Sequence, residues 1–205
     1  MQTVIGIDEA GRGPLAGPVS VACVAIHSLD VQEAFPIVRD SKKLSPKKRE
    51  VWFSEIVRLQ KEGALSYTSQ LVSERTIDLK GITHAIAQGI FDALKSVNMP
   101  KDTQILLDGG LKAPQEFIHQ KTIIKGDEKE LAIALASIVA KVTRDKYMVE
   151  LAQKYPEYGF EVHKGYGTKK HIQVLLKRGL SPIHRKTFCR RFVSSRFDLT
   201  ENTRP

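Results

Sequence analysis

The chain has 205 residues, of which 41% are hydrophobic and 27% charged, as in one ordinary soluble domain. Its longest apolar run, Val19 to Ile26, is too short to span a bilayer, no secretory signal opens the chain, and Cys23 and Cys189 cannot form a disulfide framework. The cysteine usage favours a reducing compartment, the cytoplasm, and the net charge of +9 favours a polyanionic partner.

The first elements are predicted to be two strands joined by a turn. Residues Thr3 to Ile7 are largely apolar and predict a strand that ends at Asp8 and Glu9. Residues 11–18 are rich in Gly and Pro, which is typical of a turn, and residues 19–26 predict a second, buried strand.

The middle of the chain is predicted to be mainly helical. Ser45 and Pro46 are typical of the N-cap and first position of a helix, whose apolar residues recur at helical spacing up to about position 63. Residues 64–72 predict a strand. Ser73 then caps a helical pattern that runs to about position 97, with an interruption near Gly81.

Two further strands are predicted, and each of them leads to an acid. Residues 104–107 form an apolar run that ends at Asp108. Residues 121–125 are typical of a strand, and Asp127 follows.

The second half of the chain predicts helices on a sheet. Apolar residues from Leu131 to Val142 share one face with several alanines, which predicts a helix packed closely against a sheet. Residues 169–178 predict another helix. The expected fold is therefore α/β, with a mixed sheet flanked by helices in residues 1–155, a basic helical portion in residues 156–205 of the same domain, and a polar tail at 198–205 compatible with disorder.

Positive charge is concentrated near the C-terminus. From Lys164 to Arg196 there are ten Lys or Arg residues and no Asp or Glu. Such runs are usually solvated surface, but this one is interleaved with aromatic side chains, which favours nucleic acid as the partner. The aromatic residues are Tyr166, Phe188 and Phe192.

Four acids follow apolar runs: Asp8, Glu9, Asp108 and Asp127. Ligands bind at strand ends in α/β sheets, and clustered carboxylates repel one another unless cations compensate. Mg²⁺ or Mn²⁺ fits oxygen ligands, whereas the six histidines lack zinc-binding spacing. Two such ions can promote phosphodiester hydrolysis. On the residues alone, ligand and turn interpretations of these acids are about equal.

The turn at Gly11 to Ala16 partly matches the dinucleotide fingerprint G-x-G-x-x-G/A, with Asp30 at a tolerable distance. That fingerprint requires a helix to begin there, whereas a strand is predicted. A nicotinamide-dependent oxidoreductase is therefore one alternative. A non-catalytic RNA-binding protein is another, although it leaves the four acids unexplained. Small residues beside acids favour the close approach of a substrate backbone.

The stretch Asp8-Glu9-Ala10-Gly11-Arg12-Gly13 resembles the opening signature of type 2 ribonucleases H, and specifically of bacterial ribonuclease HII. The resemblance covers about residues 4 to 192. Further matching stretches occur in the same order: Asp40 to Ser45, Leu107 to Gly109, Lys125 to Asp127, Ala136 to Asp145, Gly165 to Thr168, and Ser181 to Arg185.

This resemblance implies an RNase H-like fold and an enzyme that cuts the RNA strand of RNA–DNA hybrids. It also implies cleavage 5′ of single ribonucleotides in duplex DNA, giving 3′-hydroxyl and 5′-phosphate ends, with two Mn²⁺ or Mg²⁺ ions in the catalytic state. The implied protein is a cytoplasmic monomer without an obligate protein partner, acting in DNA replication and repair.

The resemblance also assigns residue roles. The catalytic, metal-binding residues would be Asp8, Glu9, Asp108 and Asp127. Substrate contacts would be Gly11, Arg12 and Gly13 at the ribose 2′-hydroxyl, Tyr166 at the neighbouring deoxyribose, and Ser41, Lys42 and Lys43 at backbone phosphates. Ser137 and Lys141 are open to substrate contact, but helix packing is the commoner explanation.

The chain departs from the family pattern at two positions. Gly110 stands where the family usually has Asn, and Glu130 stands where it often has a small or hydroxyl residue. The sister type, ribonuclease HIII, has an N-terminal extension and a glutamate as fourth acid. This chain starts almost directly on the first strand and has Asp127, which favours the HII type.

Overall fold

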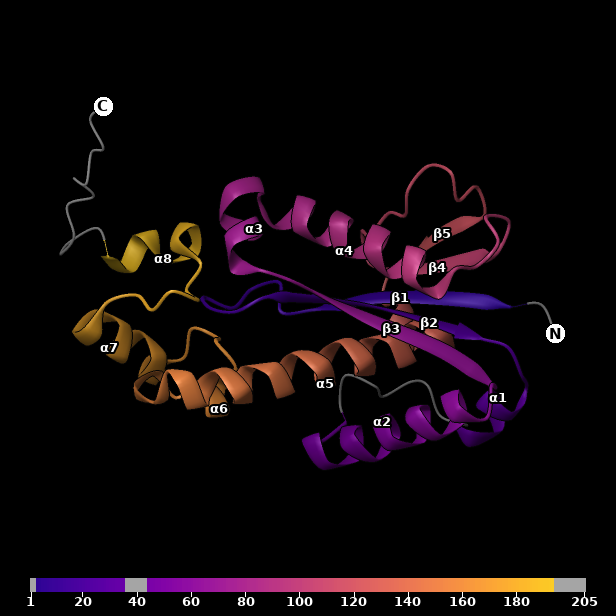
Figure 1. Ribbon diagram of the computed structural model, residues 1–205, viewed down its shortest axis with the longest axis horizontal. Coiled ribbons are helices and arrows are strands. Elements are labelled where there is room, and N and C mark those ends of the chain that lie inside the picture. The colour runs from indigo at the N-terminus through magenta and orange to yellow at the C-terminus, as the bar shows by residue number, and fades with distance from the viewer. Residues whose placement is uncertain (1–2, 36–43, 194–205) are drawn as a thin grey trace.

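One mixed sheet organises residues 3–35 and 44–193, the parts of the chain that the computed structural model describes (Figure 1). Its order is β3-β2-β1-β4-β5. The strands are β1 (Val4–Ala10), β2 (Val19–Ile26), β3 (Leu65–Val72), β4 (Gln104–Asp108) and β5 (Gln120–Ile123).

The direction of the strands places two of the predicted acids at one edge. β1 pairs with β2, and β2 with β3, in antiparallel fashion, whereas β1 pairs with β4, and β4 with β5, in parallel fashion. The β1–β4 ladder ends at the pair Ile7 and Leu107. Because the two strands are parallel, Asp8 and Asp108 follow this pair at the same edge of the sheet.

Helices cover both faces of the sheet (Figure 1). Helices α3 and α4 lie on one face, and α5 and α2 on the other. The helices are α1 (Asp30–Ala34), α2 (Pro46–Lys61), α3 (Glu74–Lys80), α4 (Ile82–Val97), α5 (Leu131–Lys154), α6 (Phe160–His163), α7 (Lys169–Arg178) and α8 (Lys186–Val193), with 3₁₀ turns η2 (Gly126–Glu128) and η3 (Pro156–Tyr158).

The alternation of side chains along β1 divides the core into two layers. Ile5 and Ile7 are buried with α4, whereas Val4 and Ala10 pack with the cluster under α5. Gly6 therefore faces α5, and a Cβ on it would lie only 2.0 Å from the backbone carbon of Ala132. The prediction of a helix packed closely on the sheet is confirmed.

Most predicted boundaries are confirmed, and their physical signals are visible. The Ser45 and Ser73 hydroxyls accept hydrogen bonds from the first turns of α2 and α3, and Gly81, with φ of 84°, separates α3 from α4. The first strand was predicted to end at Asp8 and Glu9. Antiparallel pairing with β2 carries it to Ala10.

The C-terminal helices pack against the β1–β2 turn and the end of α5. In Figure 1, α7 and α8 lie at the end of the molecule that the β1–β2 turn reaches. Residues 198–205, the predicted polar tail, are outside the described residues. Across residues 3–35 and 44–193, every helix is too short or too polar to cross a bilayer. Both cysteines are buried, as expected of small apolar side chains.

Candidate active site

Three of the four predicted acids come from neighbouring elements at one edge of the sheet. Asp8 lies two residues after Gly6 on the face of β1 that is turned toward α5, and it is buried. Asp108 ends β4 on the same face. Its Oδ1 accepts a hydrogen bond of 2.7 Å from the Gly126 amide, which places η2 and the buried Asp127 beside β4. The strand register thus places Asp8 and Asp108 at neighbouring positions of one sheet edge, and the Gly126–Asp108 hydrogen bond brings the segment that carries Asp127 beside β4.

Glu9 is placed differently from these three. Strand alternation turns its side chain to the opposite face of β1 from Asp8, and its Oε1 accepts a hydrogen bond of 3.3 Å from Arg12 Nη1. The Glu9 amide in turn donates to Asp8 Oδ1 over 2.7 Å. Glu9 is therefore at the same edge but on the other side of the strand.

The chemistry of these residues fits a hard divalent cation. Asp8, Asp108 and Asp127 offer carboxylate oxygens only, which Mg²⁺ and Mn²⁺ prefer. Both Asp127 oxygens are buried, so a nearby cation would offset the cost of that buried charge. Within the described ranges, however, no three His, Cys, Asp or Glu side chains form a ready-made metal-binding group.

The β1–β2 turn lies directly beside the acids. Gly11 has a φ of 90°, and a Cβ on it would lie 2.0 Å from Arg144 Nε, so this position requires glycine. Gly13 is exposed, with open space where a Cβ would be. The turn leads into strand β2 and not into a helix, which excludes the dinucleotide fingerprint.

Two distant segments hold this turn. The Leu15 amide donates to the Gly165 carbonyl, and the Gly17 amide donates to the Ile183 carbonyl, each over 2.8 Å. Arg144, fully buried on α5, donates to the carbonyls of Ala16, Pro18 and Lys164 over 2.8–3.1 Å. The turn, α5 and the C-terminal portion therefore form one hydrogen-bonded unit.

Tyr166 stands on the exposed side of this unit and is 40% exposed. Two cations lie near its ring: Lys141 Nζ at 5.4 Å and the Arg144 guanidinium carbon at 5.7 Å from the ring centroid. Gly165 precedes it with a φ of 84°, and a Cβ there would lie 2.4 Å from the Ala16 oxygen. Tyr166 is thereby fixed next to the β1–β2 turn.

Two neutral histidines, His184 and His171, form a hydrogen-bonded chain that ends at the backbone carbonyl of Tyr166. The Ser181 amide donates to His184 Nδ1, so the proton of a neutral His184 is on Nε2 and points at His171 Nε2, 3.0 Å away. His171 can then donate from Nδ1 to the Tyr166 carbonyl over 2.9 Å. Burial lowers the pKa of both His171 and His184 to about 4.

These depressed pKa values predict a loss of stability in mild acid. A histidine with an unperturbed pKa of 6.5 that must stay neutral when folded takes up its proton more readily in the unfolded chain. The contribution of His171 and His184 to stability is therefore complete above pH 6.5, falls as the pH drops from 6.5 to about 4, and changes no further below that. Thermal unfolding measured at several pH values between 7.5 and 4.5 should show this decline.

A pair of variants separates this effect from general acid unfolding. His184→Asn keeps an acceptor for the Ser181 amide but removes one titrating ring, so its stability should be lower at pH 7 and less dependent on pH. His84→Asn changes an exposed histidine of α4 and should follow the unchanged chain. Parallel curves for His184→Asn and the unchanged chain would contradict the assignment.

The basic C-terminal run is only partly a surface feature. Arg185, one of its ten cations, is completely buried. Phe188 and Phe192 are half-buried and pack against a small core with Leu15 and Leu175. Two cations of the run, Arg185 and Arg191, lie over their rings. Of the three aromatic residues, Tyr166 alone is exposed.

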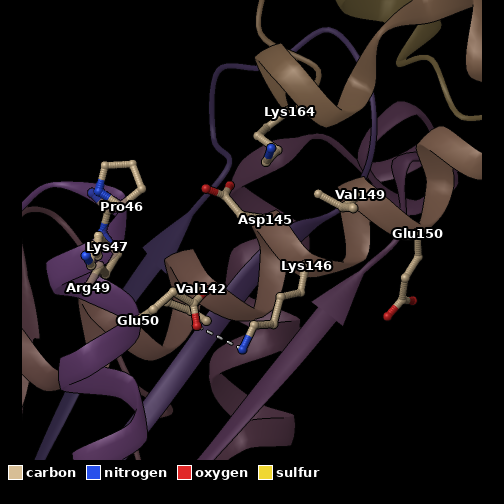
Figure 2. Close-up of a pocket in the computed structure, with 10 residues that line it drawn as sticks. All are labelled: Pro46, Lys47, Arg49, Glu50, Val142, Asp145, Lys146, Val149, Glu150 and Lys164. Atoms are coloured by element: carbon tan, nitrogen blue, oxygen red, sulfur yellow. Dashed lines mark ion pairs between the residues drawn. The ribbon is translucent and has the colours of Figure 1, made fainter.

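A cavity of about 560 Å³ lies between α2 and α5, and Figure 2 shows charged side chains of both signs around it. Lys146 is paired with Glu50 at 3.1 Å across it. None of the four acids of the candidate site lines this cavity, so it is separate from them. The described residues around it are Pro46, Lys47, Arg49, Glu50, Val142, Asp145, Lys146, Val149, Glu150 and Lys164.

The remaining predicted positions divide into three groups. Ser41, Lys42 and Lys43 lie outside the described residues. Glu130 occupies the N-cap position of α5, where a carboxylate near the positive end of the helix dipole is favourable, and Gly110 is exposed with open space around its Cα. Lys141 is paired with Asp145 at 2.8 Å on α5.

Comparison with solved structures identifies the class of fold. The chain superposes on the ribonuclease H2 of Pyrococcus horikoshii OT3 with a TM-score of 0.74 and 28% identity, covering 95% of this chain and 98% of that one. The mixed sheet, its two helical layers and this match define a ribonuclease H-like α/β fold.

Comparison of sequences then identifies the family. The family model for Ribonuclease HII matches residues 5–192. The Ribonuclease HII of Caldicellulosiruptor bescii is 46% identical over 93% of this chain and 88% of the relative, and that of Endomicrobium trichonymphae is 51% identical over 90% and 84%. The chain belongs to the ribonuclease HII family and is an endoribonuclease, a hydrolase.

Proposed function

We propose that this chain hydrolyses the RNA strand of RNA–DNA hybrids and also cuts on the 5′ side of a single ribonucleotide in duplex DNA, leaving 3′-hydroxyl and 5′-phosphate ends. The observation that carries the proposal is that Asp8 and Asp108 lie at one sheet edge, with the segment of Asp127 hydrogen-bonded to Asp108, beside a turn whose Gly13 faces open space. Family membership supports the same activity.

The cofactor in this proposal is Mn²⁺ or Mg²⁺, with two ions in the catalytic state. When bound, such ions supply a nucleophilic water at neutral pH and neutralise charge at the phosphate. Asp8, Glu9, Asp108 and Asp127 would hold them. Glu9 would approach the ions from the other side of β1, and its pairing with Arg12 joins it to the β1–β2 turn.

The substrate contacts in this proposal come from the β1–β2 turn and from Tyr166. Gly11, Arg12 and Gly13 follow Glu9 and Ala10 in the chain, so their peptide groups would lie close to a phosphate held at the acids. The ribose 2′-hydroxyl, which DNA lacks, is the group that they would recognise. The exposed ring of Tyr166 would stack on the neighbouring deoxyribose, and Ser41, Lys42 and Lys43 would contact phosphates.

The proposal is tested with a DNA duplex that contains one ribonucleotide. We expect a single incision on its 5′ side when Mg²⁺ or Mn²⁺ is added, with 3′-hydroxyl and 5′-phosphate ends identified by mass spectrometry. A duplex without the ribonucleotide should stay intact. Cleavage restricted to long RNA tracts would remove single-ribonucleotide recognition from the proposal.

Tyr166→Ala should weaken this incision selectively. Aromatic stacking in nucleic-acid complexes contributes about 1–3 kcal/mol, so kcat/KM on the single-ribonucleotide duplex should fall by about tenfold to a hundredfold. Cleavage within a long RNA–DNA hybrid should fall much less. Tyr147→Ala is the matched control, because Tyr147 is similarly exposed on α5 but has no role in the proposed site. Equal losses on the two substrates would contradict a junction-sensing role.

A further inference from the structure

Arg185 is a buried cation that the proposed reaction does not use. It lies immediately before α8 and is fully buried, although it belongs to the basic C-terminal run. The first turn of α8 is held in place by Asp78 of α3, whose carboxylate accepts hydrogen bonds from the amides of Lys186 and Thr187 over 2.8 and 3.0 Å. The hydrogen bonds to Asp78 therefore fix the backbone of the two residues that directly follow Arg185.

The Arg185 guanidinium is directed at the β1–β2 turn. Nη2 donates to the Gly11 carbonyl over 2.7 Å and to the Pro18 carbonyl over 3.1 Å, while Nη1 donates to the Arg12 carbonyl over 3.0 Å. Nε donates to the Gly17 carbonyl over 2.9 Å. The planar guanidinium thus links residues 11–12 at the start of the turn to residues 17–18 at its end, through backbone carbonyl oxygens alone.

This pattern determines where two amide groups point. The Gly11 carbonyl and the Arg12 N–H belong to one peptide plane, and the Arg12 carbonyl and the Gly13 N–H belong to the next. Every described peptide bond is trans, so carbonyl and N–H point in opposite directions. Because Arg185 binds both carbonyls from inside the protein, the N–H groups of Arg12 and Gly13 face outward, where both residues are exposed.

Two successive outward N–H groups beside the acids form a small donor site for an oxygen atom. We infer that Arg185 is a positioning residue that turns the Arg12 and Gly13 amides toward the ribonucleotide, as donors to its 2′-hydroxyl and adjacent phosphate oxygens. This inference rests on the proposed function and adds the residue that sets ribose recognition. Burial and the nearby charge of Arg144 lower the pKa of Arg185 to about 9, so it remains a full donor at neutral pH.

A matched pair of variants tests the inference. Arg185→Lys keeps a buried positive charge but loses the fork that reaches Gly11 and Arg12. Arg144→Lys makes the same chemical change at a second fully buried arginine, which also binds carbonyls of the turn but only those of Ala16 and Pro18. Any effect of merely loosening the turn should appear in both variants.

The measurement is the ratio of two dissociation constants, for a duplex with one ribonucleotide and for the same duplex in DNA alone, with EDTA present so that nothing is cleaved. We expect Arg185→Lys to reduce the preference for the ribonucleotide by about tenfold, and Arg144→Lys, which leaves the Gly11 and Arg12 carbonyls bound to Arg185, to reduce it much less. A ratio is insensitive to the fraction of folded protein. An unchanged preference in Arg185→Lys, or an equal loss in both variants, would overturn the inference.

The unchanged chain provides a test that does not depend on a variant folding. Amide hydrogen exchange at Arg12 and Gly13 should slow when the ribonucleotide duplex binds, and should slow less with the all-DNA duplex. If the chain prefers the ribonucleotide while these two amides gain no protection, Arg185 does not act as inferred. If the chain shows no preference at all, the proposed 2′-hydroxyl recognition is itself wrong, and the two failures are thereby distinguished.

Discussion

Replacement of Asp8 by Asn should lower the cleavage rate by about a thousandfold, equivalent to about 4 kcal/mol of transition-state stabilisation, while the fold stays intact. Asn has the same shape as Asp, and its Oδ1 can still accept the hydrogen bond that the Glu9 amide donates over 2.7 Å. The change therefore removes charge and leaves the local geometry. Asp127→Asn, at the other buried acid, should have the same effect.

The measurement is single-turnover cleavage of the one-ribonucleotide duplex at saturating Mg²⁺ or Mn²⁺, together with thermal unfolding of each variant. Asp102→Asn is the control, since Asp102 is exposed in the connection before β4. It should cleave at the rate of the unchanged chain. Retained cleavage in Asp8→Asn, with normal folding, would show that this carboxylate does not take part in the reaction.

The sequence could predict the acids because their signal is local. An apolar run followed by a polar residue indicates a strand end, and parallel strands end at one sheet edge. In the structure Asp108 does end β4, and Asp8 follows the last pair of the parallel β1–β4 ladder, although β1 itself continues to Ala10. The structure also shows the limit, because strand alternation separates Glu9 from Asp8, which a list of acids near strand ends does not reveal.

The role of the buried arginines could not be predicted in the same way. In the sequence Arg185 is one of ten cations in a basic run, and its neighbours Lys186, Arg190 and Arg191 are equally charged. Only the contact between residue 185 and residues 11–18, which are far apart in the chain, buries it. Charge patterning reports how many cations a segment has, but it carries no information on which of them leave the surface.

Glu130 departs from the pattern of the family that the sequence resembles, and its place in the structure explains how a glutamate is accommodated. The structure places position 130 at the N-cap of α5. Hydroxyl side chains are favoured at N-caps because they accept a helix N–H, and a carboxylate is favourable there through the helix dipole. The substitution at position 130 therefore changes the N-cap of α5.

Gly6→Ala is expected to destabilise the chain by about 4 kcal/mol or more, enough to leave little folded protein at 37 °C. A Cβ at Gly6 would lie 2.0 Å from the Ala132 carbonyl carbon, 2.2 Å from its oxygen and 2.4 Å from the Ile133 nitrogen. These are backbone atoms of α5, so the clash cannot be relieved by rotating a side chain. Relief requires β1 and α5 to separate, which opens the core between them.

The same contact sets the spacing of the candidate site. Asp8 lies two residues beyond Gly6 on the same face of β1, and Asp127 lies just before the first turn of α5, which contains Ala132. Thermal unfolding and the yield of soluble protein measure the effect, with Gly110→Ala as control, because a Cβ there meets open space. A Gly6→Ala chain as stable as Gly110→Ala would mean that α5 does not rest on β1 this closely, and the burial of Asp8 on the face of β1 turned toward α5 would then lose its structural basis.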